Sequence, residues 1–361
     1  AKSQVHLDYT LNANYLYDKG TVTAEKQASE DNYIGYTGMF MSRYLPFDRL
    51  ILGIDDYFAK TRNPVKSDKF GNPVTMNVAF TNHLTSGIWY IYDPEFIAGF
   101  RFRYTKADYQ RPDPEDSIEC KLLTDIIYNF TDTTSFELEY HYWKRYFDYY
   151  YPNYVSNRVT GILRKQFKYS SFEVAGGYNI RKFDGGAMKD IDLAAFRIAF
   201  MYQTPSPPDP MPRWHLPRSY LLFIAGQHLD DAGNENEYFT ARRFSLEAGH
   251  IFLEKVLLNF GAAYQEGDYE TFTGLIPAGR TELRTDKTFS LAGMIGYKIT
   301  DWLSIYVRAG YEKRDSNLRG YSYTSNFCMA QLEFSYKYFS RKYSGILFEP
   351  DKRLDIYNRR L

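Results

Sequence analysis

A histidine follows two glutamates at a spacing that could support acid–base catalysis or metal binding. His141 comes after Glu137 and Glu139 at two-residue intervals. An imidazole beside a carboxylate is a common general base, and both groups are ligands of Zn²⁺. Residues two apart also share one face of a β-strand, so the three side chains fit a polar wall at least as well.

The rest of the sequence gives catalysis little support. The six histidines form no pair at metal-ligand spacing, and neither a Gly-x-Ser-x-Gly motif nor a phosphate-binding glycine loop occurs. Two cysteines are too few for a disulfide framework or a Cys-based metal cluster, and no Cys-x-x-Cys-His motif for haem is present. We therefore predict that the chain is not an enzyme and holds no cofactor and no metal.

The composition excludes two further classes of protein. The 361-residue chain carries 44 basic and 44 acidic side chains, whereas nucleic-acid binding needs a clustered excess of Lys and Arg. Mean hydropathy is −0.49 and no run of about 18 apolar residues occurs, which excludes a transmembrane helix. The 35 Tyr and 27 Phe instead suit a membrane β-barrel, whose aromatic side chains gather at the two interfaces.

Alternation of apolar and polar residues predicts the strands of such a barrel. In segment 4–17, odd positions from Val5 to Tyr17 are apolar or aromatic, and even positions from Gln4 to Asn14 are polar. A period of two is that of a β-strand, and this length crosses a bilayer at a tilt. The predicted strands are 4–17, 32–44, 49–60, 74–91, 95–109, 118–129, 135–148, 157–167, 171–182, 191–204, 219–229, 238–252, 256–266, 286–299, 302–313 and 322–338.

The connections alternate between short turns and longer polar loops. The fold class is therefore all-β: a transmembrane antiparallel up-and-down β-barrel of about 16 strands, within a range of about 14–18, over residues 1–339. Bacterial outer-membrane barrels have short periplasmic turns and longer external loops, and we expect this arrangement here. Loops 18–31 and 267–285 are the longest candidates for narrowing the lumen, although both are short for that task.

Charged residues fall on one phase of the alternation. A charge that faces hydrocarbon at the bilayer midplane costs about 2–4 kcal/mol, so we expect the apolar phase to face lipid and the charged phase to face the lumen. Both signs interleave there, which predicts a mixed-sign lumen without strong selectivity. The predicted pore-lining residues are Arg101, Arg103, Glu119, Glu137, Glu139, Arg164, Arg197, Arg243, Glu247, Arg308, Glu312 and Glu333.

The same phase also contains Lys121, Asp125, Arg145, Arg158, Glu173, Arg181 and Lys298. An alternative role for all these charges is a ladder of ion pairs that stiffens the wall, and the two roles are compatible.

Cys120 and Cys328 fall on the lipid-facing phase, where a thiol behaves as a small apolar group, and we expect no disulfide between them.

Two segments depart from the strand pattern. The proline-rich segment 205–217 cannot pair within a sheet; it is either an elongated turn on the periplasmic side or a docking segment for a periplasmic partner, with Pro207, Pro208 and Pro210 as its candidate contacts. Residues 340–361 form a basic tail, which we expect in the periplasm because the strand number is even. Arg353 is the candidate contact if this tail binds a partner.

One stretch near the C-terminus resembles a known group of proteins. Residues 310–317, which read Gly-Tyr-Glu-Lys-Arg-Asp-Ser-Asn, are followed by a loop, by Tyr-Thr-Ser-Asn at 323–326 and by an alternating strand. This arrangement resembles the closing hairpin of the outer-membrane β-barrel porin group, some of whose members accompany exopolysaccharide secretion clusters. The basic tail departs from the usual ending of that group.

The resemblance and the pattern together imply a porin-like channel for passive passage of small polar solutes. The localisation would be the bacterial outer membrane, in contact with its lipid and lipopolysaccharide, after removal of a signal peptide not present in this sequence. The alternative is a barrel sleeve or export pore in a multi-component complex, for exopolysaccharide secretion or for a cytochrome electron conduit. A membrane hydrolase of phospholipase or protease type is the third hypothesis.

Overall fold

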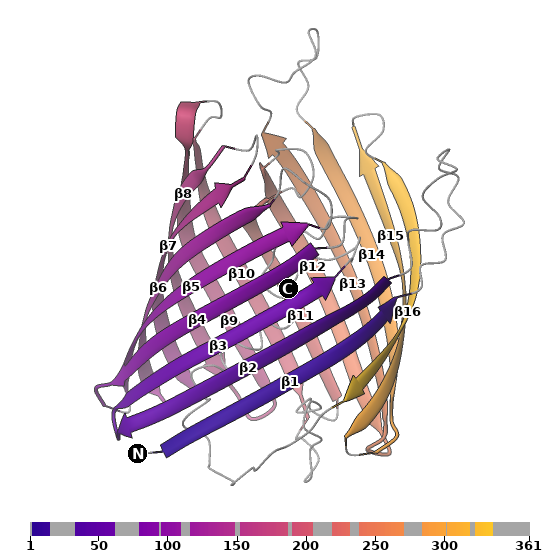
Figure 1. Cartoon of the computed structure of the whole chain (residues 1–361), viewed down its shortest axis with the longest axis horizontal. Coiled ribbons are helices and arrows are strands. Elements are labelled where there is room, and N and C mark those ends of the chain that lie inside the picture. The colour runs from indigo at the N-terminus through magenta and orange to yellow at the C-terminus, as the bar shows by residue number, and fades with distance from the viewer. Residues whose placement is uncertain are drawn as a thin grey trace.

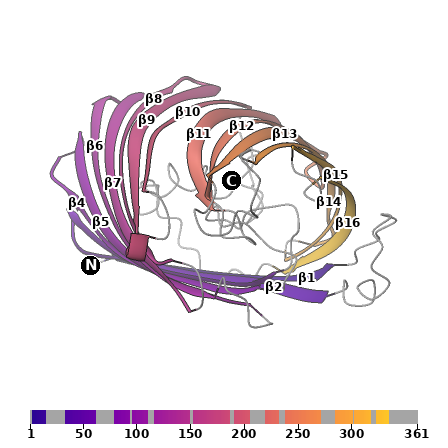
Figure 2. The ribbon, with the colours of Figure 1, turned by 90° about the horizontal axis from the view of Figure 1, so that it is seen from above.

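The strand pattern closes into a single barrel. The computed structural model describes residues 2–14, 33–61, 79–93, 95–109, 116–148, 152–186, 190–204, 219–231, 238–270, 284–300, 302–317 and 322–334. Within them, sixteen strands pair antiparallel with their neighbours in sequence, and the first also pairs with the last. Figures 1 and 2 show this ring of tilted strands from the side and from above. The predicted fold class is confirmed.

The strands are long enough to cross a membrane at a tilt. They are β1 (Lys2–Asn14), β2 (Tyr33–Phe47), β3 (Leu50–Thr61), β4 (Ala79–Ile91), β5 (Phe96–Tyr109), β6 (Ser117–Thr131), β7 (Thr134–Phe147), β8 (Tyr154–Gln166), β9 (Ser170–Phe183), β10 (Ile191–Gln203), β11 (Ser219–Asp231), β12 (Tyr238–Phe252), β13 (Val256–Glu270), β14 (Thr285–Lys298), β15 (Leu303–Ser316) and β16 (Tyr323–Phe334). No helix among the described residues is long and apolar enough to span a membrane.

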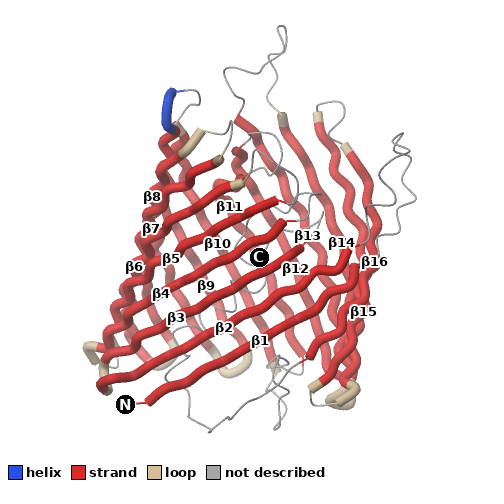
Figure 3. The backbone as a smooth tube through the Cα atoms, viewed as in Figure 1, coloured by secondary structure: helices blue, strands red, loops and turns tan. Residues whose placement is uncertain are grey.

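The two ends of the barrel differ in their connections. Short turns join β2 to β3, β4 to β5, β6 to β7, β8 to β9, β12 to β13 and β14 to β15, and the N-terminus lies at this same end, called the turn end below (Figure 1). The opposite end, the loop end, carries the short helix η1 (Asp184–Gly186) (Figure 3). At the three-residue β12–β13 connection, Leu253 and Glu254 have φ angles of 49° and 58°, the positive values that the two central residues of a type I′ turn adopt.

Strand boundaries differ from the sequence prediction at a few places. β8 begins at Tyr154 rather than at residue 157, and β13 continues to Glu270 rather than ending at residue 266. The expected loop 267–285 is therefore shorter than predicted, because residues up to Glu270 pair with β12. Polar residues at a strand end leave no apolar alternation to read, although the backbone ladder continues. Segments 18–31, 205–217 and 340–361 lie outside the described residues.

Candidate functional site

Exposure alternates along the strands and separates two faces of the wall. On β7, Leu138 and Tyr140 are each 43% exposed, whereas Glu137 and Glu139 are 1% and 8% exposed. Side chains on the concave inner face of a closed barrel crowd one another, and those on the convex outer face diverge. The charged phase of β7 is therefore its inner face, and the apolar phase is its outer face.

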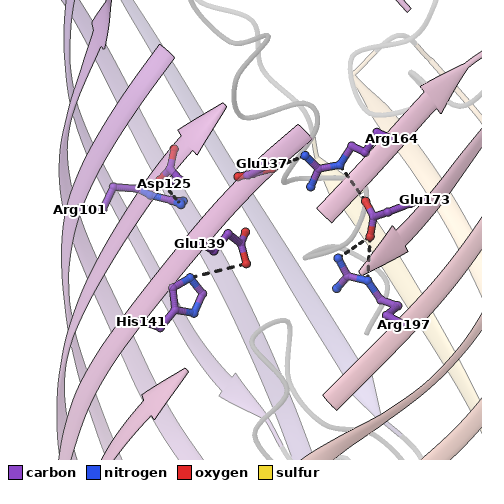
Figure 4. Close-up of polar contacts among 8 residues, drawn as sticks. All are labelled: Arg101, Asp125, Glu137, Glu139, His141, Arg164, Glu173 and Arg197. Atoms are coloured by element: carbon purple, nitrogen blue, oxygen red, sulfur yellow. Dashed lines mark hydrogen bonds and ion pairs between the residues drawn. The ribbon is translucent and has the colours of Figure 1, made fainter. Parts of the chain in front are cut away.

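Four charged side chains form a continuous series of ion pairs on the inner face of β7 to β10 (Figure 4). Glu173 Oε2 accepts from Arg164 Nε at 2.8 Å, and Glu173 Oε1 accepts from Arg197 Nη2 at 2.5 Å. Arg164 also pairs with Glu137. Two carboxylates thus share two guanidinium groups, and the attraction between them offsets the cost of removing these charges from water.

A second polar group lies on β5 to β8. Arg101 Nη2 is 2.8 Å from Asp125 Oδ1, and both are drawn in Figure 4. His141 Nδ1 lies 2.7 Å from Arg158 Nη2. A guanidinium group can only donate, so His141 Nδ1 accepts and the ring is neutral in this arrangement.

This geometry argues against a catalytic or metal-binding role for the histidine. Glu139 Oε2 is 3.9 Å from His141 Nε2, which is too long for the hydrogen bond that a carboxylate–imidazole base needs. Among the residues that the structure describes, no group of three or more His, Cys, Asp or Glu side chains could hold a metal ion. The three residues act here as parts of the polar wall.

The other predicted pore-lining residues are spread around the ring. Arg103 Nη2 is 3.8 Å from Glu119 Oε1. Glu247 accepts hydrogen bonds from Tyr220 and Asn259, both at 2.7 Å.

Further around, Glu312 accepts from the hydroxyl of Tyr323, and Arg243 and Arg308 lie partly exposed on the inner faces of β12 and β15. Glu333 of β16 pairs with Ser304 of β15, and the side chain of Glu333 is outside the part that the structure describes. All four predicted docking residues lie outside the described part of the chain: Pro207, Pro208, Pro210 and Arg353.

One charged pair escaped the sequence analysis. Arg43 donates to both carboxylate oxygens of Asp55, at 2.5 Å and 2.8 Å, and its guanidinium group lies 5.1 Å from the ring centre of Trp89. The alternation of 32–44 is weak, because Gly, Thr and Ser interrupt it, so the phase of Arg43 could not be assigned. The strong signal was Arg43 itself, since a lone Arg in a strand otherwise rich in Tyr, Phe and Met must face inward.

The inner face is not polar along its whole height. At the turn end, buried apolar side chains cluster on neighbouring strands, each 8% exposed or less. We call them the apolar belt: Leu45, Ile51, Trp89, Ala199, Met201, Leu222, Ile224, Ile251, Leu257 and Tyr306. The expectation of a polar interior is wrong at this end. Period-two alternation assigns a residue to a face but gives no measure of which inward residues pack against each other.

Both cysteines are free, as predicted. Cys120 is partly exposed and Cys328 is exposed, and each shares the outer phase of its strand. Comparison with known protein families gives a match over part of the chain. The family model described as "Putative beta-barrel porin 2" matches residues 225–336, from β11 to the end of β16. The resemblance to the outer-membrane β-barrel porin group is confirmed.

Solved structures of outer-membrane proteins are similar to this barrel at low sequence identity. A loop L8 deletion mutant of OmpT, an outer membrane protein of Vibrio cholerae, is 14% identical with a TM-score of 0.50, covering 92% of this chain and 99% of that chain. The trimer form of in-vitro folded OmpT gives 14% identity and a TM-score of 0.50 over 93% and 100% of the two chains. OpdQ of Pseudomonas aeruginosa is 10% identical over 92% and 95%, with a TM-score of 0.46.

No curated protein sequence matches the chain. The likeness to OmpT, at a TM-score of 0.50, shows that this chain has the fold of an outer-membrane β-barrel. The family match adds a resemblance to porins over residues 225–336.

Proposed function

We propose that this barrel is a passive, non-enzymatic channel for small polar solutes, with a charged, mixed-sign lumen. The observation that carries the proposal is the inner face of β5 to β10, where charged side chains pair across neighbouring strands. A wall built only for stability could bury apolar side chains instead. Charged groups turned inward are what a water-filled passage needs.

The opposite wall supports a wide passage. In two rows near the middle of β12 to β15, six of the eight inner positions are small, and the other two are Glu247 and Glu312. The small residues lie side by side through cross-strand pairing; they are Ser245, Gly261, Ala263, Ser290, Ala292 and Gly310. Small side chains leave free space in front of the wall. Barrels of about 16 strands are also wide enough for an aqueous channel.

Reconstitution in planar bilayers tests the channel. We expect stepwise current increments, each linear with voltage, and release of a small neutral sugar from liposomes that contain the protein. A folded barrel that conducts no current at any voltage, with liposomes that retain the sugar, would overturn the proposal. Turnover of lipid or peptide substrates by the same sample would contradict the non-enzymatic part.

The proposal includes an orientation. The turn end would face the periplasm, as the short turns of outer-membrane barrels do, so the end of β16 and the basic tail 340–361 would lie on that side of the membrane. The outer face, with its exposed apolar side chains, would contact lipid and lipopolysaccharide. Protease added outside intact cells should then cleave the loop end and leave the tail intact.

The apolar belt favours one second candidate, a sleeve around a protein or polymer partner in an export or electron-transfer complex. Buried apolar side chains inside one mouth are what a docked partner would pack against. Mild-detergent extraction from native membranes separates the two functions. A sleeve should bring its partner in a constant ratio, whereas the barrel recovered alone would count against it.

A further inference from the structure

Charges on the inner face are sorted by height as well as by sign. Cross-strand pairing sets Arg103, Lys121, Trp143, Ser156 and Arg181 in one row from β5 to β9. The next row toward the turn end consists of Arg101, Leu123, His141, Arg158 and Asn179. These two rows hold five cationic side chains and no carboxylate. We call the five the cationic band: Arg101, Arg103, Lys121, Arg158 and Arg181.

Carboxylates occupy the flanking rows, and two of them reach the band: Asp125 lies 2.8 Å from Arg101, and Glu119 lies 3.8 Å from Arg103. Asp125 and Glu139 face each other one row closer to the turn end. Glu119 lies one row closer to the loop end, opposite Arg145. Positive and negative side chains balance over the lumen as a whole, but the two rows of the cationic band contain positive side chains and no carboxylate.

Two members of the band are direct neighbours of like charge. Arg103 and Lys121 are cross-strand partners, and like charges directly opposite each other destabilise a sheet. Glu119, 3.8 Å from Arg103, offsets part of this repulsion. The ammonium group of Lys121 lies 4.4 Å from the ring centre of Trp143, and this cation–π contact supplies no negative charge. On the next row, the buried Nε of Arg158 has no hydrogen-bond partner, and its Nη2 meets only the neutral nitrogen of His141 among the contacts described.

We propose that the cationic band is a binding site for a small oxyanion, either a carboxylate or a phosphate group. Arg103, Lys121 and Arg158 would supply most of the donors, because guanidinium groups match the geometry of both anions and an ammonium group adds a point charge. The rings of Trp143 and Tyr154 would hold the cations in place, since Arg181 lies 4.1 Å from the ring centre of Tyr154. Asp125 and Glu139 would then limit how far an anion travels toward the turn end before it is released.

The effect of the site on ion passage rests on the proposed channel function, but the binding experiment does not. If the barrel conducts, an oxyanion at this site gives anions a longer stay in the lumen than cations. Binding itself is measurable on the folded protein in detergent without any current. The two proposals can therefore fail separately.

Fluorescence of Trp143 reports binding, because the ring touches Lys121. We expect inorganic phosphate, added at constant ionic strength, to change the emission along a saturable curve. Lys121→Met should raise the half-saturation concentration at least tenfold, and Lys121→Arg should restore it to within about threefold. Trp143→Phe should remove the signal, which identifies the reporter among the four Trp residues.

The matched control is Lys298→Met, which removes one ammonium group from the inner face of β14 on the opposite wall. It should leave the half-saturation concentration within about twofold of the wild-type value. A linear response in the wild type, or equal curves for Lys121→Met and Lys298→Met, would overturn the site. In planar bilayers, phosphate should reduce the current of the wild-type channel more than that of the Lys121→Met channel. Equal block of two conducting channels would also count against the site. Saturable phosphate binding by a protein that conducts no current would count against the channel alone.

Discussion

Glu173 is the most constrained carboxylate of the inner face at the scale of single residues. Its side chain is 1% exposed and pairs with both Arg164 and Arg197. Removing one partner of a buried ion pair leaves an uncompensated charge, which typically costs about 3–5 kcal/mol. Both arginines keep some contact with solvent, at 14% and 28% exposure, so the cost here should lie at the lower end.

We expect Glu173→Gln to lower the free energy of unfolding by about 3 kcal/mol, measured by urea titration of the barrel in lipid vesicles. Asp132→Asn, on the exposed β6–β7 turn, serves as the control and should change it by less than about 0.5 kcal/mol. In a double-mutant cycle, Glu173→Gln and Arg197→Gln should be non-additive by more than about 1 kcal/mol. Additive effects would show that the pair is not coupled.

The sequence could assign Glu137, Arg164 and Arg197 to one face but could not pair them. Pairing depends on register, which hydrogen bonds between strands decide, and period-two alternation is unchanged when a strand slides by two residues. For the same reason the cationic band was invisible in the sequence. Its five members come from four different strands, and only the observed register sets them in two rows.

At the scale of the strand, Ala262 and Ala263 on β13 offer a matched comparison of the two faces. Ala262 shares its face with Phe260 and Tyr264, which are 52% and 37% exposed, whereas Ala263 shares its face with Leu257, which is 1% exposed. The two alanines are neighbours near the middle of the strand. The same substitution at each position therefore reports on the surroundings alone.

Ala262→Arg should lower the free energy of unfolding in vesicles by about 2–4 kcal/mol, because it places a charge in hydrocarbon. Ala263→Arg should cost less than about 1 kcal/mol, because its guanidinium group reaches water in the lumen. Refolding and urea titration of both variants measure the difference. Equal costs, or a larger cost at Ala263, would mean that the faces are assigned the wrong way round.

Strand number and order were predictable because the alternation recurs with turn signals between segments. The boundary of β13 was less so, because the strand continues into polar residues where apolar periodicity ends. β8 begins directly after Pro152 and Asn153, which are typical turn residues, so its first residues were assigned to the loop. The apolar belt was missed for a different reason. Ile51 and Leu257 stand in short apolar runs, where alternation assigns no face; in the structure both side chains are buried on the inner face.

At the scale of the whole molecule, the seam between β1 and β16 decides whether the barrel is closed. The two strands pair from Tyr9 with Phe334 to Ala13 with Ala330, a shorter ladder than the one between β1 and β2, which runs the length of β1. An open seam would leave backbone groups unpaired in lipid, at a cost of several kcal/mol for each. Closure is therefore expected to persist in a bilayer.

A cross-link tests closure directly. Leu11 and Leu332 are cross-strand partners, and directly opposed residues lie about 4.5–5.5 Å apart, within the range of a disulfide. With Cys120 and Cys328 replaced by Ser, Leu11→Cys with Leu332→Cys should oxidise almost completely in vesicles and shift in a non-reducing gel. The control pair Leu11→Cys with Leu258→Cys, from strands that do not pair, should stay reduced.

The central claim is that alternate residues face lipid and a water-filled passage. Single-channel recording with a bulky, water-soluble, negatively charged thiol reagent tests it most directly, using Ala262→Cys and Ala263→Cys in a background with both native cysteines replaced by Ser. The account predicts that the reagent lowers the current of each Ala263→Cys channel in a discrete step and leaves the Ala262→Cys channels unchanged. Block of Ala262→Cys instead, or no effect on either open channel, would contradict it.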